Sequence, residues 1–204
     1  NRKISKTGIY QIFRELFDNN MGPAIVFNTD TDTCYKMFKD LYTEIHKTEE
    51  LEYPYHYDIL NYKQKLFLAY NDRYKDFNKK LKEEERYDKI NNFNKKETDL
   101  YTTNVSNYYE KLLDKINKND KIDKKNQKVQ YNNLYDEFQE FLNYPDLSRK
   151  DVYKKHKKFC FTRQVPMSGD TIREIRREIS KSTGIDIDYE SVLFQMLKRG
   201  IGIY

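Results

Sequence analysis

Apolar residues recur at helical spacing near the start of the chain. Residues 9–17 carry them three and four positions apart, which predicts an amphipathic helix. The same spacing over 34–45 predicts a second helix, capped by Thr31 or Asp32. Between the two, residues 24–27 form a continuous apolar run, typical of a strand buried in a parallel sheet. This order predicts a strand, a polar loop and a helix.

The middle of the chain has a different pattern. Residues 67–81 place aromatic and aliphatic side chains three and four apart, which is a heptad seam. Two further helical faces lie at 109–116 and 131–142, and polar joints at 91–96 and 117–126 separate the three. Three long helices with polar linkers predict a small bundle or an extended antiparallel arm.

The last third returns to short elements. Residues 148–151 resemble a capping box that opens a short basic helix, and residues 171–174 form a second box that opens another. Asp188 is expected to cap a last helix, and residues 201–204 then have the apolar character of a strand.

Two motifs more than a hundred residues apart carry a resemblance. Residues 21–34 are MGPAIVFNTDTDTC, and residues 190–204 are ESVLFQMLKRGIGIY. Together they resemble the second motor lobe of superfamily-2 helicases, the DExH-box RNA helicases of the superkiller type. In that family a strand such as AIVFN opens the second RecA-like lobe, and a helix ending in L-x-R-G-I-G-x-H-H leads into a later strand. This chain departs from the pattern at Tyr204, which replaces the first histidine.

The resemblance implies the fold class and the domain organisation. We expect an α/β fragment that is predominantly helical, with a few parallel strands of a RecA-like sheet and an inserted bundle of long helices. Residues 1–50 are expected to start the RecA-like lobe, residues 51–147 to form the helical insertion, and residues 148–204 to supply basic helices and the return to the lobe.

Charge distribution indicates a polyanionic partner. The formal net charge is +5, and Lys and Arg greatly outnumber Asp and Glu over residues 148–181. Such clustering is typical of nucleic-acid-binding surfaces, although a solvated helix face is the alternative. The candidate nucleic-acid-binding residues in this segment are Lys154, Lys155, Lys157, Lys158, Arg173, Arg176 and Arg177.

The loop after the predicted first strand is a further candidate. Asn28, Thr29 and Thr31 would lie at the carboxyl end of that strand and lead into a helix N-terminus, where backbone N–H groups bind anions. In the resembling helicases this position helps to grip the sugar-phosphate backbone. Asp30 and Asp32 oppose this role because carboxylates repel phosphate, so an ordinary capped turn remains the alternative.

The RGIG segment is the last candidate. Gly200 and Gly202 permit a close backbone approach, and Arg199 can reach a phosphate or cap the carbonyls at a helix C-terminus. The resemblance places this segment near the nucleic-acid path.

No catalytic or metal-binding residue is predicted. The sequence contains no phosphate loop, no His, Cys and carboxylate group at metal-ligand spacing and no nucleophile elbow. ATP and Mg²⁺ would belong to the intact parent helicase, and this fragment alone is not expected to hydrolyse ATP. Cys34 and Cys160 indicate free thiols, and no apolar run is long enough to span a membrane. We therefore expect no membrane partner and an intracellular location, in the cytoplasm or a viral particle or factory.

Three functions fit these patterns. The leading interpretation is a part of the C-terminal motor lobe of an ATP-dependent RNA or DNA helicase, with single-stranded RNA or DNA as ligand and a protein partner on the insertion. The alternative is a helical adaptor, a protein-interaction module with a basic nucleic-acid-binding segment. The third is a basic nucleic-acid-binding module unrelated to helicases. A sheet that pairs 24–27 with 201–204 would favour the motor lobe, and an all-helical structure would favour the adaptor.

Overall fold

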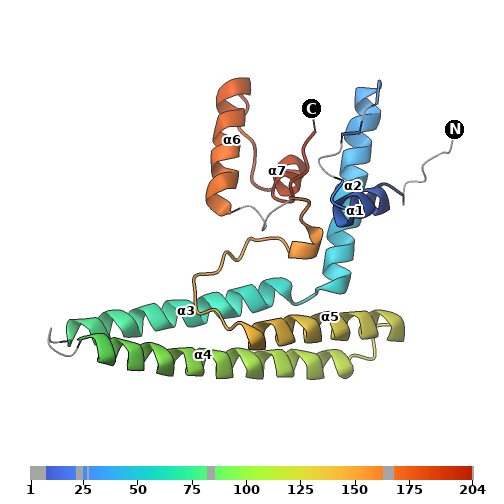
Figure 1. Cartoon of the computed structure of the whole chain (residues 1–204). Coiled ribbons are helices and arrows are strands. Elements are labelled where there is room, and N and C mark those ends of the chain that lie inside the picture. Colours follow the sequence, from blue (N-terminus) through green and yellow to red (C-terminus); the bar gives the residue numbers. More distant parts are fainter. Residues whose placement is uncertain (1–7, 22–24, 27, 82–85, 163–167, 204) are drawn as a thin grey trace. The chain divides into compact units, whose positions relative to one another are not determined.

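The computed structural model describes residues 8–21, 25–26, 28–81, 86–162 and 168–203. The chain divides into two compact units (Figure 1). Unit 1 comprises Asn1–Glu50 and Tyr153–Tyr204, and unit 2 comprises Leu51–Val152. Unit 2 is therefore inserted, in sequence, between two halves of unit 1. The segment expected to form the helical insertion, 51–147, lies within unit 2.

Unit 2 is built from three long helices that lie side by side (Figure 1). They are α3 (His56–Lys79), α4 (Arg86–Asn117) and α5 (Lys124–Asn143). Helix α4 packs along both of its neighbours. Its buried face combines aromatic and aliphatic side chains, and Tyr109 stacks on Phe138 and Phe141 with ring centroids 5.1 and 5.9 Å apart. The other buried members of this core are Ile59, Tyr101, Val105, Leu112, Leu113, Ile116 and Leu134.

Beyond the end of α5, helices α3 and α4 continue as a two-helix hairpin (Figure 1). Phe93 of α4 stacks on Phe77 of α3 with ring centroids 4.3 Å apart. Arg73 and Glu97 form a bidentate ion pair next to these rings, with Nε–Oε1 at 2.9 Å and Nη2–Oε2 at 2.5 Å. The predicted seam over 67–81 is helical as far as Lys79, where α3 ends. The predicted joint at 91–96 is wrong, because α4 runs through it and Phe93, half-buried, stacks on Phe77 of α3.

The connection between α4 and α5 reverses the chain at the joint predicted for 117–126. Asp123 caps α5 by accepting hydrogen bonds from the backbone N–H groups of Lys125 and Asn126. Gln127 donates from Nε2 to the carbonyl of Ile116 at 2.8 Å and so satisfies one of the open carbonyls at the end of α4.

Unit 1 contains α1 (Gly8–Asp18), most of α2 (Thr31–Glu52), the 3₁₀ turn η2 (Lys157–Phe159), α6 (Gly169–Thr183) and α7 (Val192–Leu197). The helices predicted over 9–17 and 34–45 are confirmed. Helix α2 buries Phe38, Leu41 and Ile45 at helical spacing. A smaller apolar cluster joins α6 and α7 through Ile172, Ile187 and Phe194.

The expected RecA-like sheet is not present, because the residues that the structure describes contain helices and turns but no strand. The α/β fold class is therefore wrong for this part of the chain. Ile25 and Val26 are 71% and 56% exposed, and residues 201–203 are likewise not in a strand. Ala24, Phe27 and Tyr204 lie outside the described residues. A strand needs a partner that satisfies its N–H and C=O groups, and an apolar run does not by itself supply one.

Local boundaries also differ from the sequence-based expectations. The residues that cap α2, α6 and α7 are Asp30, Ser168 and Ser191. The predicted caps were Thr31 or Asp32, Thr171 and Asp188. The short basic helix predicted at 148–151 does not form, because Lys150 donates its backbone N–H to Gln64 Oε1 at 2.8 Å in place of a helical carbonyl.

Candidate functional site

A buried ion pair joins the two halves of unit 1. Glu49 lies near the end of α2 and Arg199 follows α7, and their side chains are 4% and 0% exposed. Arg199 Nη2 and Glu49 Oε2 are 2.5 Å apart. Removing two charges from water is costly, so such a pair persists only where further hydrogen bonds support it.

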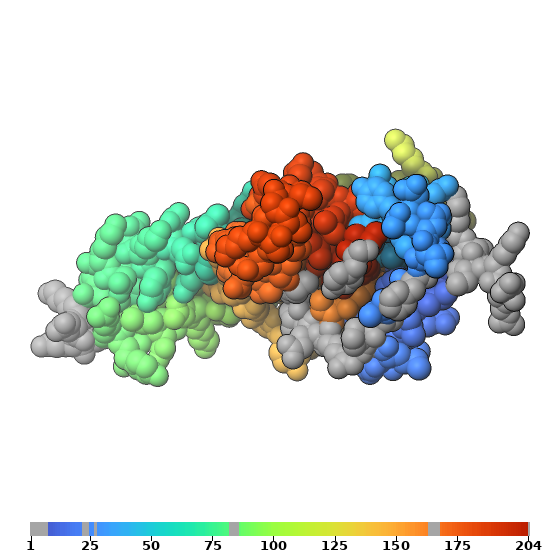
Figure 2. Space-filling view, turned by 90° about the horizontal axis from the view of Figure 1, so that it is seen from above, coloured from blue at the N-terminus to red at the C-terminus, as the bar shows by residue number. Residues whose placement is uncertain are grey.

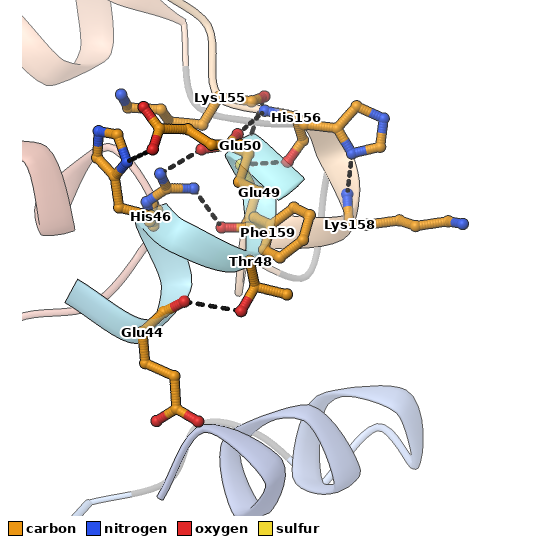
Figure 3. A network of polar contacts seen from close by, with 11 residues as sticks. Glu44, His46, Thr48, Glu49, Glu50, Lys155, His156, Lys158 and Phe159 are labelled. Atoms are coloured by element: carbon orange, nitrogen blue, oxygen red, sulfur yellow. Dashed lines mark hydrogen bonds and ion pairs between the residues drawn. The ribbon is translucent and has the colours of Figure 1, made fainter. Parts of the chain in front are cut away.

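Those further hydrogen bonds come from the segment around η2 (Figure 3). The backbone N–H of His156 donates to Glu49 Oε1 at 2.8 Å. Arg199 Nη1 donates to the carbonyl of Phe159 at 3.3 Å, and the N–H of Phe161 donates to the carbonyl of Arg199 at 2.6 Å. The ion pair therefore fixes the path of residues 156–161 against α2 and the turn after α7.

The charge state of Glu49 follows from these contacts. Burial opposes its ionisation and raises the pKa of the carboxyl group. The hydrogen bond and positive charge of Arg199, together with the His156 N–H, outweigh burial and hold the pKa of Glu49 below its usual value. Glu49 is therefore a carboxylate whose charge is neutralised within the fold.

Gly200 lets the turn after α7 approach this segment closely. Its φ is +80°, in the region that favours glycine. A Cβ atom at this position would lie 2.5 Å from Thr162 Cγ2 and 3.3 Å from the carbonyl carbon and oxygen of Phe161. A glycine is needed here to pack the chain, whatever its role in binding.

Residues 154–158, which we name the lysine segment, concentrate positive charge beside the ion pair. Lys154, Lys155, Lys157 and Lys158 fall within 152–162, a stretch with no acidic residue. His156 is buried, and its Nδ1 accepts a hydrogen bond from the backbone N–H of Lys158 at 3.3 Å, which starts the 3₁₀ turn. Lys157 and Lys158 are exposed on this turn.

A second cationic segment adds to this charge. Burial, together with the positive charges of Arg199 and Lys198, lowers the pKa of Lys155 to about 8. Lys198 is therefore an electrostatic neighbour of the lysine segment, although it follows α7 in the sequence. Cations from two distant parts of unit 1 act together here, and the nearby carboxylate Glu49 is already paired.

Aromatic contacts hold α1 on the same segment. Tyr10 stacks on Phe159 with ring centroids 6.4 Å apart, and Phe17 meets Phe161 edge to face at 5.6 Å. Arg14 also donates to the carbonyl of Lys158. Helix α1 thus supports the lysine segment through its apolar face.

The α6 arginines lie outside this network. Figure 2 shows α6 at the surface of the molecule. Arg173 pairs with Asp170 one turn earlier in the same helix. Arg176 pairs with Asp186 at 2.7 Å and donates from Nε to the carbonyl of Ile187, so it fastens the following loop to α6. Arg177 is exposed on the helix.

The loop before α2 does not form an open anion site. Asn28, Thr29 and Thr31 are exposed, but the carboxylate of Asp30 accepts the N–H of Asp32 and the hydroxyl of Thr33. The Thr33 hydroxyl, with the Asp32 N–H, lowers the pKa of Asp30. The chain's own carboxylate therefore occupies the N-terminus of α2.

The RGIG candidates have separate positions. Arg199 is inside the fold, and Gly200 is needed for packing. Gly202 is exposed, and a Cβ atom there would make only an ordinary contact, 3.8 Å from Leu197 Cδ2. The structure thus brings Arg199 and Gly200 to the lysine segment in structural roles.

Sequence reasoning did not identify Glu49, His156 or Lys198. A signal for Glu49 was present, since it continues the register of Phe38, Leu41 and Ile45 on the buried face of α2. A carboxylate in an apolar register predicts a buried cationic partner. Nothing local identifies that partner, because Arg199 is 150 positions away.

No protein-family model, no curated protein and no solved structure matches the chain. The resemblance to superkiller-type helicases stays a prediction, and the described residues lack the sheet that it implied. Within the described part of the chain, none of the helices combines the length and the apolar character needed to cross a bilayer.

Proposed function

We propose that the chain is a helical adaptor that binds single-stranded RNA or DNA through the lysine segment and offers unit 2 to a protein partner. The observation that carries the proposal is the concentration of Lys154, Lys155, Lys157, Lys158 and Lys198 beside a carboxylate that Arg199 already neutralises. Phosphate groups bind clustered lysines and release counterions when they do so.

The helical architecture supports an adaptor over a motor. Unit 2 has its own apolar core. Beyond the end of α5, it continues as a two-helix hairpin held by the Phe77–Phe93 stack. A long hairpin with a self-contained core is a rigid element on which a partner can dock.

Fluorescence anisotropy with a labelled single-stranded oligonucleotide tests the binding role. Lys157→Glu combined with Lys158→Glu should weaken binding at least tenfold and make the affinity less dependent on salt, since each lost phosphate contact with a single strand removes about 0.7 from the logarithmic salt slope. The matched control is Lys121→Glu with Lys125→Glu, two exposed lysines of unit 2. Equal losses in both variants would show that only net charge matters and would contradict the proposal.

A second candidate function is a part of a helicase motor lobe. One observation favours it: α2, which begins within the 21–34 motif, and Arg199, which lies in the 190–204 motif, are joined by the buried ion pair of unit 1. If the chain is part of a helicase, Arg199→Ala in the intact protein should abolish nucleic-acid-stimulated ATP hydrolysis. If the chain is an adaptor, the same substitution should leave any ATPase activity of the intact protein unchanged.

A further inference from the structure

An exposed tyrosine adjoins the lysine segment. Tyr153 is 74% exposed and directly precedes Lys154 and Lys155. Lys198 Nζ lies 5.8 Å from the centroid of its ring, near the outer limit of a cation–π contact. The ring thus stands in the cationic surroundings described above while most of its area is open to solvent.

Lys198 is held in place by the fold. Its backbone N–H donates to the carbonyl of Phe194 at the end of α7, and the next residue, Arg199, is bound to Glu49. Lys198 Nζ also lies 5.0 Å above the ring of Phe194. The position of the cation beside Tyr153 therefore depends on the buried ion pair.

Tyr189 of the same unit provides a contrast. The guanidinium of Arg176 lies 4.0 Å from its ring centroid, and Phe194 meets it edge to face at 5.0 Å. Tyr189 is accordingly 46% exposed. Its contacts belong to the packing of α6 and α7, whereas Tyr153 is a much more exposed residue.

We propose that Tyr153 stacks on an unpaired base of the bound strand, so that the site selects single-stranded over double-stranded nucleic acid. This inference rests on the proposed function, in which the lysines bind phosphates. An aromatic ring beside clustered cations is the combination that binds single strands, because phosphates meet the cations while a base stacks on the ring. Bases inside a duplex are already stacked and offer no face to the tyrosine.

The experiment compares variants of the full chain with a labelled single-stranded oligonucleotide of about ten nucleotides, within the usual site size of such proteins. Tyr153→Ala should weaken binding by about tenfold, the range for the loss of one stacked base. Tyr153→Phe should keep nearly the full affinity, since the ring remains. The matched control is Tyr144→Ala, because Tyr144 is 81% exposed in unit 2 and should contribute nothing.

An abasic oligonucleotide of the same length separates stacking from a structural role. Tyr153→Ala should leave its affinity unchanged, because only phosphates are bound. Equal weakening with the abasic and normal strands would overturn the inference, as would an unchanged affinity of Tyr153→Ala for the normal strand. If the Lys157 and Lys158 variant still loses binding in those cases, the proposed function stands. A wild-type chain that binds neither oligonucleotide overturns the proposed function itself.

Discussion

Units 1 and 2 are stabilised by different kinds of interaction. Unit 2 is held by rings and aliphatic side chains from three consecutive helices, centred on Tyr109. In unit 1 the buried pair Glu49 and Arg199 connects segments 150 positions apart in the sequence. Apolar burial is non-directional and tolerates many partners, whereas a buried ion pair requires one geometry. Single substitutions should therefore destabilise the two units in different ways.

Separating the units should have the largest effect. Residues 51–152 expressed alone should be strongly helical by circular dichroism and should unfold cooperatively, because the described residues of their core all lie within unit 2. A disordered spectrum would show that unit 2 depends on unit 1 and would remove the distinction between them.

Removing one member of the buried ion pair should be the most damaging single change. Arg199→Ala leaves a buried carboxylate without its partner and should cost unit 1 about 3–5 kcal/mol of unfolding free energy. Urea denaturation of the full chain should then show an early transition assigned to unit 1, with the transition of unit 2 unchanged. The double variant Glu49→Leu with Arg199→Met should recover part of the loss, and an equal loss in both variants would argue against an unpaired charge as the cause.

Truncating a core side chain of unit 2 should destabilise unit 2 and leave unit 1 unchanged. Phe138→Ala removes a ring that stacks on Tyr109 and should cost about 3 kcal/mol. In the same urea denaturation experiment, only the transition of unit 2 should shift, to a lower urea concentration. Phe138→Leu, which keeps most of the buried volume, should cost less than half as much, and a shift of both transitions together would mean that the units unfold as one.

Lys63 of unit 2 should give a smaller, pH-dependent effect. Burial, with the charge of Lys150, lowers the pKa of Lys63 from 10.5 to about 8, and its Nζ donates to the hydroxyl of Tyr109 at 3.1 Å. Between these two values the unfolded chain binds more protons than the folded chain. The unfolding free energy of unit 2 should therefore rise with pH above about 8, up to about pH 10, where the tyrosines begin to ionise.

Lys63→Met should remove this dependence and stabilise unit 2 at pH 7 by about 1 kcal/mol, since the apolar side chain has no charge to desolvate. Denaturation at a series of pH values from 7 to about 9.5 measures both effects. Lys65→Met is the control, because Lys65 is exposed on the same helix. If the unfolding free energy of unit 2 depends on pH in the same way in Lys63→Met and Lys65→Met, a group other than Lys63 causes the dependence.

Much of the helical content could be predicted because a helix satisfies its hydrogen bonds within four residues. The spacing of apolar residues in α1, α2 and α5 gave helices at the expected places. The polar joint expected at 91–96 failed because local composition does not show that Phe93 packs on Phe77 of the preceding helix. Tertiary contact there outweighs a weak local preference.

The candidate site was only partly predictable. The lysines are visible as a run of charge, and Tyr153 is visible next to them. Their setting is not, because the ion pair that fixes residues 156–161 depends on Glu49, which lies in the other half of unit 1. The sequence left Arg199 to a phosphate or to the carbonyls at a helix C-terminus, and the fold pairs it with the carboxylate of Glu49.

The sequence by itself determined most of the helices, the charge of the lysine segment and the glycine turn after α7, since each depends on neighbouring residues. Only the tertiary structure decided which side chains are buried together and whether apolar runs become strands. Ile25 and Val26 have strand-like character but no strand partner among the described residues. Pairing between distant segments is a property of the whole chain, because each partner must be brought to the other before its hydrogen bond or charge can stabilise anything.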